Sequence, residues 1–176
     1  MENRKLKVSE MKRLSPEQYM ERPESGLVIV LDNVRSAYNV GSAFRSADAF
    51  GVDKIYLCGI CPTPPSTEIH KTALGAEESL AWQYEADILK LVKRLKSDDY
   101  TIISVEQTHN SVKLISPDTL PKTQKTALIF GNEVEGVQQS VVDASDFSLE
   151  IPQHGTKHSL NVAVTVGIVL FAFTAR

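Results

Sequence analysis

The sequence predicts an α/β domain built on a mostly parallel β-sheet that is flanked by helices. Short runs of apolar and β-branched residues recur along the chain, and helical patterns separate them. The chain has 176 residues, which is about the length of one domain. Strands that alternate with helices are typical of a parallel sheet with helices packed on its faces.

Five segments have the composition of buried strands. Their apolar residues are nearly continuous rather than alternating, which is typical of central strands covered on both faces. We predict strands over residues 27–31, 54–58, 101–105, 127–130 and 147–151.

Two helices are predicted from apolar residues that recur every three or four positions. In the first, Val40, Ala43, Phe44 and Ala47 form one face. In the second, residues 86–96, apolar residues occupy one face and basic residues the other. Residues 59–80 contain several prolines and are expected to form a long irregular connection, a type of segment that is often functional.

The C-terminal stretch 159–175 is uncharged and predicts an apolar helix. It is short for a membrane span and contains Ser159, Asn161, Thr165 and Thr174. We therefore expect it to be buried against the sheet or against a partner subunit. The polar N-terminus lacks the apolar core of a secretory signal, so we expect a cytoplasmic protein with no membrane association.

The charge of the chain is slightly acidic and unevenly distributed. Lys and Arg number 19 and Asp and Glu 22, for a net charge of −3, which excludes a protein that coats nucleic acid by bulk charge. Residues 1–22 hold six basic and four acidic residues, whereas the rest holds 13 and 18. We divide the chain into a polar basic arm, residues 1–25, and a domain, residues 26–176. A solvated terminus is the more common role for such an arm, and phosphate contact is the alternative.

Cysteine and histidine give little indication of chemistry. Cys58 and Cys61 form a single C-x-x-C that runs into a proline-rich segment, and the four histidines lack a zinc-ligand spacing. We expect two buried or loop thiols and no metal site.

Three polar segments follow predicted strands directly. They are residues 32–45, 131–136 and 151–161. Because the carboxyl ends of parallel strands meet at one edge of a sheet, we expect the three segments to form a site. Gly131 and Gly136 have the spacing of a P-loop, but Val137 and Gln138 replace its Lys-Ser/Thr pair. Dinucleotide-binding and nucleophile-elbow motifs are also absent from the sequence.

Asparagines are frequent at the ends of the predicted strands and the starts of the helices. An isolated asparagine there is most often a cap or a turn residue. Ser159 and Asn161 both precede the apolar helix, which needs only one cap. Capping therefore does not explain the whole pattern, and the four candidates for a functional role are Asn33, Asn39, Asn132 and Asn161.

The motifs NVGSAFR (39–45), IFGNEVEG (129–136) and IPQHG with SLN (151–155 and 159–161) resemble, in order and spacing, those of the SpoU–TrmH branch of the SPOUT superfamily. The resemblance covers about residue 27 to the C-terminus. It implies a methyltransferase that uses S-adenosylmethionine and acts on a ribose 2′-hydroxyl of RNA. It also implies a C-terminal trefoil knot, and a homodimer whose site is completed across the subunit interface.

The resemblance also implies roles for individual residues. Arg45 matches the motif arginine, with Asn39 as its orienting neighbour. A guanidinium stays protonated in proteins, so we expect Arg45 to clamp a phosphate or the 2′-oxygen, with base catalysis as the alternative. Glu133 orients polar groups or accepts a proton, and Ser159 and Asn161 lie beside the reacting ribose. The residues expected to hold the cofactor are Thr108, Gly131, Ile151, Ser159, Leu160 and Asn161.

RNA contact is expected from basic residues in or near the motifs, namely Arg35, Arg45, Lys71 and Lys157. About 25 residues precede the first strand, fewer than an extra RNA-binding domain needs, which favours tRNA modestly over rRNA. Methylation of rRNA, methylation of a base nitrogen, and a catalytically silent RNA-binding dimer are the alternatives.

Overall fold

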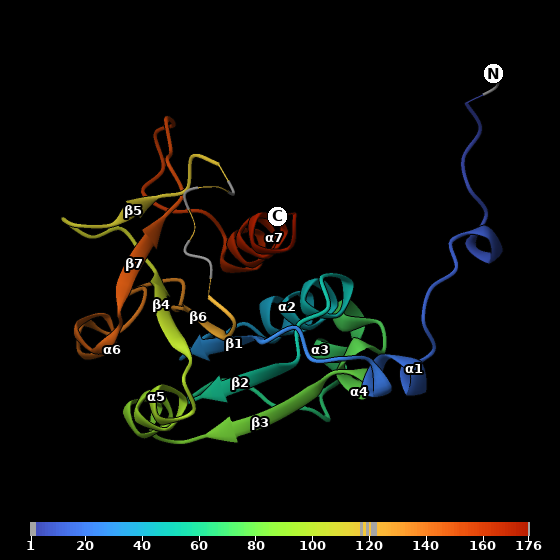
Figure 1. Cartoon of the computed structure of the whole chain (residues 1–176), viewed down its shortest axis with the longest axis horizontal. Helices are drawn as coiled ribbons and strands as arrows, with labels where there is room; N and C mark the ends of the chain where they lie inside the picture. Colours follow the sequence, from blue (N-terminus) through green and yellow to red (C-terminus); the bar gives the residue numbers. More distant parts are fainter. Residues whose placement is uncertain (1–2, 117, 119, 121–122, 176) are drawn as a thin grey trace.

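A computed structural model describes residues 3–116, 118, 120 and 123–175. In this part of the chain a seven-stranded sheet has the order β3-β2-β1-β6-β4-β7-β5, and all paired strands are parallel (Figure 1). The strands are β1 Leu27–Asp32, β2 Lys54–Cys58, β3 Ala81–Glu85, β4 Thr101–Val105, β5 Val112–Lys113, β6 Thr126–Phe130 and β7 Phe147–Glu150. The predicted α/β class is confirmed, whereas the trefoil knot stays a prediction.

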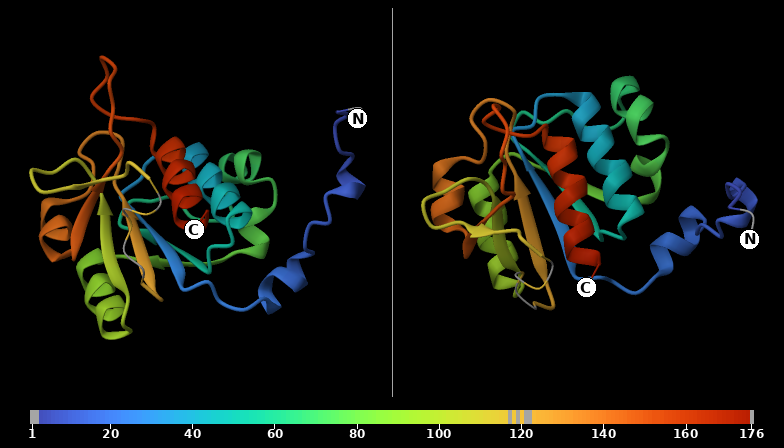
Figure 2. Two further views of the ribbon diagram at one scale, coloured as in Figure 1. Left: turned by 45° about the horizontal axis from the view of Figure 1, so that its top comes forward. Right: turned by 90° about the horizontal axis from the view of Figure 1, so that it is seen from above.

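Helices cover both faces of the sheet (Figure 2). On one face lie α2 Ala37–Ala49, α3 Thr67–Ala73, α4 Ala76–Ser79 and α7 Val162–Thr174, and on the other lie α5 Ile88–Ser97 and α6 Gln139–Ala144. Alternate residues of β1 point into the two cores, Ile29 toward α2 and Val30 toward α5. Every residue of β1 and β6 is buried, as expected for central strands.

The structure adds elements that the apolar pattern did not predict. Strand β3 reads AWQYE, is only partly buried and lies at the edge of the sheet, so it lacks the continuous apolar run of a central strand. Strand β5 has two residues and α6 has six, which is too short for periodicity to indicate.

The prediction of an irregular connection over residues 59–80 is wrong, because this segment contains α3 and α4. Ser66 caps α3 by accepting a hydrogen bond from the Ile69 amide. Leu74 and Gly75 then turn the chain with positive φ angles of 54° and 93°. The segment was misassigned because two helices of seven and four residues show little apolar periodicity.

Helix α7 packs one side against the domain. Asn161 caps it by accepting hydrogen bonds from Ala163 and Val164, and Val166 and Val169 are fully buried. Figures 1 and 2 show α7 lying beside α2. Its opposite side leaves apolar residues exposed, namely Val164, Ile168 and Phe171. In the described part of the chain, no helix combines the length and the hydrophobicity needed to cross a membrane.

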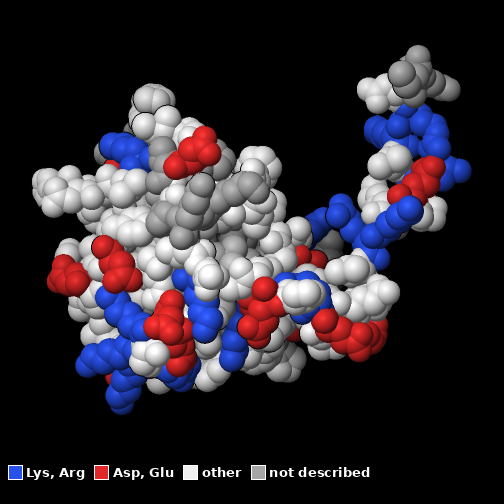
Figure 3. All heavy atoms as spheres, in the orientation of Figure 1, with Lys and Arg blue, Asp and Glu red and all other residues white. Residues whose placement is uncertain are grey.

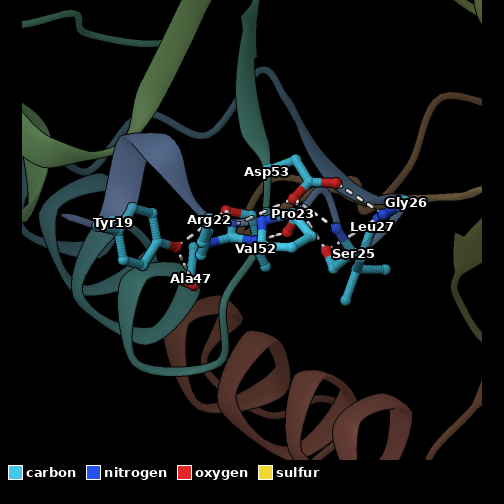
Figure 4. Close-up of polar contacts among 9 residues, drawn as sticks. All are labelled: Tyr19, Arg22, Pro23, Ser25, Gly26, Leu27, Ala47, Val52 and Asp53. Carbon is cyan, nitrogen blue, oxygen red and sulfur yellow. Dashed lines mark hydrogen bonds and ion pairs between the residues drawn. The ribbon is translucent and has the colours of Figure 1, made fainter. Parts of the chain in front are cut away.

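Residues 16–22 of the N-terminal segment pack against the domain. Helix α1, Pro16–Glu21, has a capping box at Ser15. The Tyr19 hydroxyl and the Arg22 guanidinium both donate to the Val52 carbonyl, at 2.9 Å each, and Arg22 pairs with Asp53 at 3.1 Å (Figure 4). Residues 3–15 extend away from the body (Figure 1). Basic side chains predominate along this arm, while both signs are interspersed over the visible face of the body (Figure 3).

The two cysteines are buried on opposite faces of the sheet. Cys58 packs with the α5 core and Cys61 with the α2 core. The Cys61 thiol donates to the Leu31 carbonyl at 3.2 Å and accepts from the Val34 amide at 3.1 Å. Burial raises the pKa of Cys58 and raises the pKa of Cys61 to about 11. Both thiols are buried, one of the two predicted environments, and their raised pKa values disfavour the reactive thiolate.

Candidate functional site

A cavity of about 290 Å³ opens at the carboxyl ends of β4, β6 and β7. The second and third polar segments form most of its wall, through residues 131–136, 151, 153 and 158–160. The end of β4 and the first residues of α7 complete it. Its apolar lining residues are Val105, Phe130, Val134, Leu149, Ile151, Leu160 and Val162. The expectation that polar segments meet at one edge of the sheet is confirmed.

The floor of the cavity is a tight turn closed by Asn132. The backbones of Asn132 and Gly136 exchange two hydrogen bonds, at 3.2 and 3.1 Å, and the Asn132 side chain accepts from the amides of Val134 and Glu135. A Cβ at Gly131 would lie 1.9 Å from the Gly136 backbone, so only glycine fits there. Asn132 is therefore a turn residue, the more common of its two interpretations.

Two carboxylates hold the end of this turn from opposite sides. Glu106, which follows β4, accepts the Val137 amide at 3.0 Å. Asp32, the last residue of β1, is fully buried and accepts the Gln138 amide at 2.9 Å and its side-chain amide at 2.7 Å. Consecutive backbone amides are thus fixed by β4 and β1. We call this pair, Asp32 and Glu106, the carboxylate clamp.

A chain of hydrogen bonds joins the three polar segments at the mouth of the cavity. The Asn161 side chain donates to Asn39 Oδ1 at 3.1 Å, and Asn39 Nδ2 donates to Glu133 Oε1 at 2.7 Å. Asn161 Oδ1 already accepts the hydrogen bonds that cap α7. The Nδ2 group of Asn161 is therefore the part of its side chain that bonds to Asn39, and it can only donate. The direction of every bond in the Asn161–Asn39–Glu133 chain is therefore set by the helix cap.

Glu133 serves in this chain as an anionic acceptor. Partial burial on its own raises the pKa of Glu133, but hydrogen bonds from the Asn39 side chain and from the backbone of Glu133, Arg35 and Ser36 outweigh it, so the pKa lies below its ordinary value. A carboxylate with a lowered pKa is a weak proton acceptor at neutral pH. Of the two predicted roles for Glu133, the geometry favours orienting the polar groups.

Most of the residues predicted to hold the cofactor line the cavity, and the others lie outside its lining. Gly131, Ile151, Ser159 and Leu160 line the cavity, as does Glu133. Asn39 and Asn161 lie beside it through the hydrogen-bonded chain. Thr108 is not among the lining residues, and Val105, Glu106 and Gln107 form that part of the wall instead.

The predicted RNA-contacting residues all lie at the surface. Arg35 precedes α2, Lys71 is on α3, Lys157 is in the third polar segment, and each is exposed. Arg45 is exposed on α2 and does not line the cavity. It lies six residues after Asn39, about 9 Å further along the helix.

Sequence reasoning missed several residues of the site. The sequence patterns include Asp32 only as the first position of the polar segment 32–45, and they do not single out Glu106 or Gln107. Gln107 donates from its side chain to the His158 carbonyl at 2.7 Å and so ties the third segment to the end of β4. Their position directly after β1 and β4 was the available signal, because strand ends border the site.

One group of described residues has the spacing of metal ligands, namely His70, Glu77 and Glu78 on α3 and α4. His70 pairs with Glu77 at 2.6 Å, and Glu77 also accepts the Gly75 amide. These bonds account for the group as part of the turn between the two helices.

The comparisons with known proteins match this arrangement. The model of the SpoU rRNA Methylase family matches residues 26–171. The 23S rRNA (guanosine-2′-O-)-methyltransferase RlmB of Nitrosomonas europaea is 31% identical over 151 residues, 84% of this chain and 55% of that protein. The tRNA (guanosine(18)-2′-O)-methyltransferase of Aquifex aeolicus is 29% identical over 164 residues, 92% of this chain and 74% of that protein.

A solved structure shows the same fold. The AdoMet-bound rRNA methyltransferase from Sinorhizobium meliloti superposes with a TM-score of 0.75 at 26% identity, over 91% of this chain and 60% of that one. The chain thus spans little more than half the length of some of these proteins. The family match covers the sheet and all three polar segments, and the chain belongs to the SpoU rRNA methylase family.

Proposed function

We propose that this chain transfers a methyl group from S-adenosylmethionine to a ribose 2′-hydroxyl of RNA in the cytoplasm. The observation that carries the proposal is the Asn161–Asn39–Glu133 chain. It joins the three family motifs at the mouth of one cavity, within a chain that belongs to the SpoU family.

The cavity has the chemistry that S-adenosylmethionine needs. Its apolar side chains suit the faces of the adenine ring, and Gly131, Ile151 and Leu160, which line it, are the residues whose backbone groups we expect to bond the polar edges of the cofactor. Its carboxylates suit a cationic ligand. The cofactor supplies an electrophilic methyl group when bound, and the chain supplies binding and orientation.

The main contribution of the protein is the placement of the ribose hydroxyl. Methyl transfer is fast when the two reacting atoms are held about 3–3.5 Å apart in line. Asn161 and Asn39, each fixed by two or more hydrogen bonds, and the hydroxyl of Ser159 border the position for that oxygen. Arg45 supplies a cation for a phosphate or for the 2′-oxygen.

The proposal includes a homodimer. Val164, Ile168 and Phe171, exposed by 51%, 38% and 60%, form an apolar stripe on α7, and α2 lies beside it with Arg45 on its exposed side. A second copy covering this stripe removes apolar surface from water. In the proposed dimer Arg45 serves the cavity of the partner, which accounts for an arginine that does not line its own.

Both tRNA and rRNA are candidate substrates. The relative that modifies tRNA shares more of its length with this chain, 74%, which supports tRNA as our first choice. The relative that modifies 23S rRNA has the higher identity, 31%, and supports rRNA as the second.

The test is mass spectrometry of RNA nucleosides from a strain that lacks the gene, with tRNA and rRNA digested separately. Loss of one 2′-O-methylnucleoside from one fraction supports the proposal and identifies the substrate. Loss of a methylated base shows base methylation instead. An unchanged nucleoside profile, together with no heat of S-adenosylmethionine binding at millimolar concentration, indicates a silent RNA-binding dimer.

A further inference from the structure

The ionised side chains around the cavity are all acidic. Its lining includes four glutamates, Glu106, Glu133, Glu135 and Glu150. Among the residues that the structure describes around the cavity, none is Lys or Arg, and the one histidine is His158. A cavity with this lining has a negative potential, since low-dielectric walls focus the field of the charges that they carry.

Three of the four carboxylates lack a cationic partner in the described structure. Glu150 pairs with Lys113 at 2.9 Å, so its charge is compensated. Glu106 accepts only backbone amides, from Val137 and Gln107, and Glu133 accepts backbone and asparagine amides. Amide donors stabilise a carboxylate without cancelling its charge.

Glu135 differs from the other two in having a free side chain. Its backbone amide donates to Asn132, whereas its carboxylate has no hydrogen-bond or ion-pair partner among the described residues, and the residue is exposed at the rim of the cavity. Its charge can be removed without breaking a bond that holds the turn.

We propose that Glu106, Glu133 and Glu135 make the cavity select cationic S-adenosylmethionine over its neutral product, S-adenosylhomocysteine. The inference rests on the proposed function. In methyl transfer the bond between sulfur and the methyl carbon breaks and its electron pair stays on sulfur, an O–CH₃ bond forms, and the hydroxyl proton passes to solvent water. The sulfonium thereby becomes an uncharged thioether. Attraction to the carboxylates is thereby lost at the moment of reaction, which favours exchange of product for fresh cofactor.

The expected size of the effect follows from Coulomb attraction. One carboxylate at about 6 Å from a cation, in surroundings between protein surface and water, changes a dissociation constant by about threefold to tenfold. Because the cavity is open, salt screens part of this attraction.

The test is titration calorimetry of the full chain with S-adenosylmethionine, S-adenosylhomocysteine and sinefungin, whose amine carries a positive charge in place of the sulfonium. Measurements at about pH 8 keep an ordinary histidine neutral. We expect Glu135→Gln to raise the dissociation constants of S-adenosylmethionine and sinefungin about threefold to tenfold. The dissociation constant of S-adenosylhomocysteine should stay within about twofold of the wild-type value. The control is Glu68→Gln on α3, outside the cavity, which should change none of the three.

Equal weakening of all three ligands, or no change in any, overturns the inference while leaving the proposed function intact. A thermal unfolding midpoint that matches the wild type shows that the variant is folded. Failure of the wild-type chain to bind either cofactor form contradicts the proposed function, and the inference with it.

Discussion

Asn39 occupies the centre of the site because it is both an acceptor and a donor. Its oxygen takes the Asn161 amide at 3.1 Å, and its amide reaches Glu133 at 2.7 Å. An aspartate of the same shape keeps the first bond but replaces the donor with a second oxygen facing the Glu133 carboxylate. Replacing the amide of residue 39 by a carboxylate therefore tests the hydrogen-bonded chain directly.

We predict that Asn39→Asp lowers kcat by about a hundredfold, because misplaced reacting groups cost rate by that order, and that the Kd for S-adenosylmethionine changes little. Steady-state kinetics with a methyl-labelled cofactor and calorimetry measure the two quantities. A variant with wild-type kcat would show that the chain does not position the reacting groups.

The lowered pKa of Glu133 has a consequence for stability in acid. A group whose pKa is depressed by folding stabilises the folded state above its unfolded pKa, and this contribution is lost as the pH falls through the folded value. The relevant window lies below the ordinary glutamate value of about 4.3.

We therefore predict that the stability advantage of wild type over Glu133→Gln shrinks as the pH is lowered from about 5 to about 3. Urea unfolding of both proteins at several pH values measures it. A constant difference across this range would mean that Glu133 is not held as an anion by its neighbours.

At the scale of elements, the carboxylate clamp determines how the turn over residues 131–136 sits on the sheet. Asp32 on β1 and Glu106 after β4 take successive amides of the segment that leads into α6. Asp32 also accepts the side-chain amide of Asn33 at 2.9 Å. In an Asp32→Asn variant, the new side-chain NH₂ group would face the N–H groups of Asn33 and Gln138 that Asp32 now accepts, so donors would face donors.

We predict that Asp32→Asn lowers the free energy of unfolding by about 2–3 kcal/mol, because it leaves buried donors unsatisfied, and weakens S-adenosylmethionine binding. The control Gln138→Ala loses only the side-chain bond to Asp32 and keeps the backbone one, so it should cost about 1 kcal/mol or less. Chemical denaturation and calorimetry check both. Equal costs for the two variants would contradict the role of the backbone bond.

The elements differ in how far the sequence predicts them. Central strands such as β1 and helices such as α5 were predicted because burial on defined faces imposes an apolar pattern on their residues. Edge strand β3 and helices α3 and α4 were missed because tertiary packing, rather than pattern, stabilises short or half-exposed segments.

The residues of the candidate site also differ in how far the sequence predicts them. The motif residues Asn39, Glu133 and Asn161 were predicted from the family resemblance and lie together. The roles of Asp32 and Glu106 depend on which strand ends are neighbours in the sheet order, and no local pattern encodes that order.

At the scale of the whole molecule, the central question is whether a site is made by one chain or two. Arg45 does not line the cavity of its own chain and is exposed on α2, the helix that packs beside α7. We predict that Ile168→Lys converts a dimer into a monomer, since it places a charge in the centre of a closely packed apolar contact. Light scattering coupled to size-exclusion chromatography measures the mass, and Lys71→Glu on α3 serves as a charge-changing control. A monomeric wild type would refute the dimer.

A dimer with shared sites also predicts complementation. Arg45→Ala and Asn161→Ala, each inactive alone, should regain about a quarter of wild-type activity when the subunits are unfolded and refolded together, because a mixed dimer then contains one intact site. No recovery would place Arg45 and Asn161 in the same subunit's site.

The proposed methyl transfer is tested by identifying the product of the reaction. The purified chain is incubated with methyl-labelled S-adenosylmethionine and unmodified tRNA or rRNA, and the RNA is digested to nucleosides for mass spectrometry. We predict label on the ribose of a 2′-O-methylnucleoside, and its loss in the Asn39→Asp variant. Label on a base, or none with either RNA, would contradict this prediction.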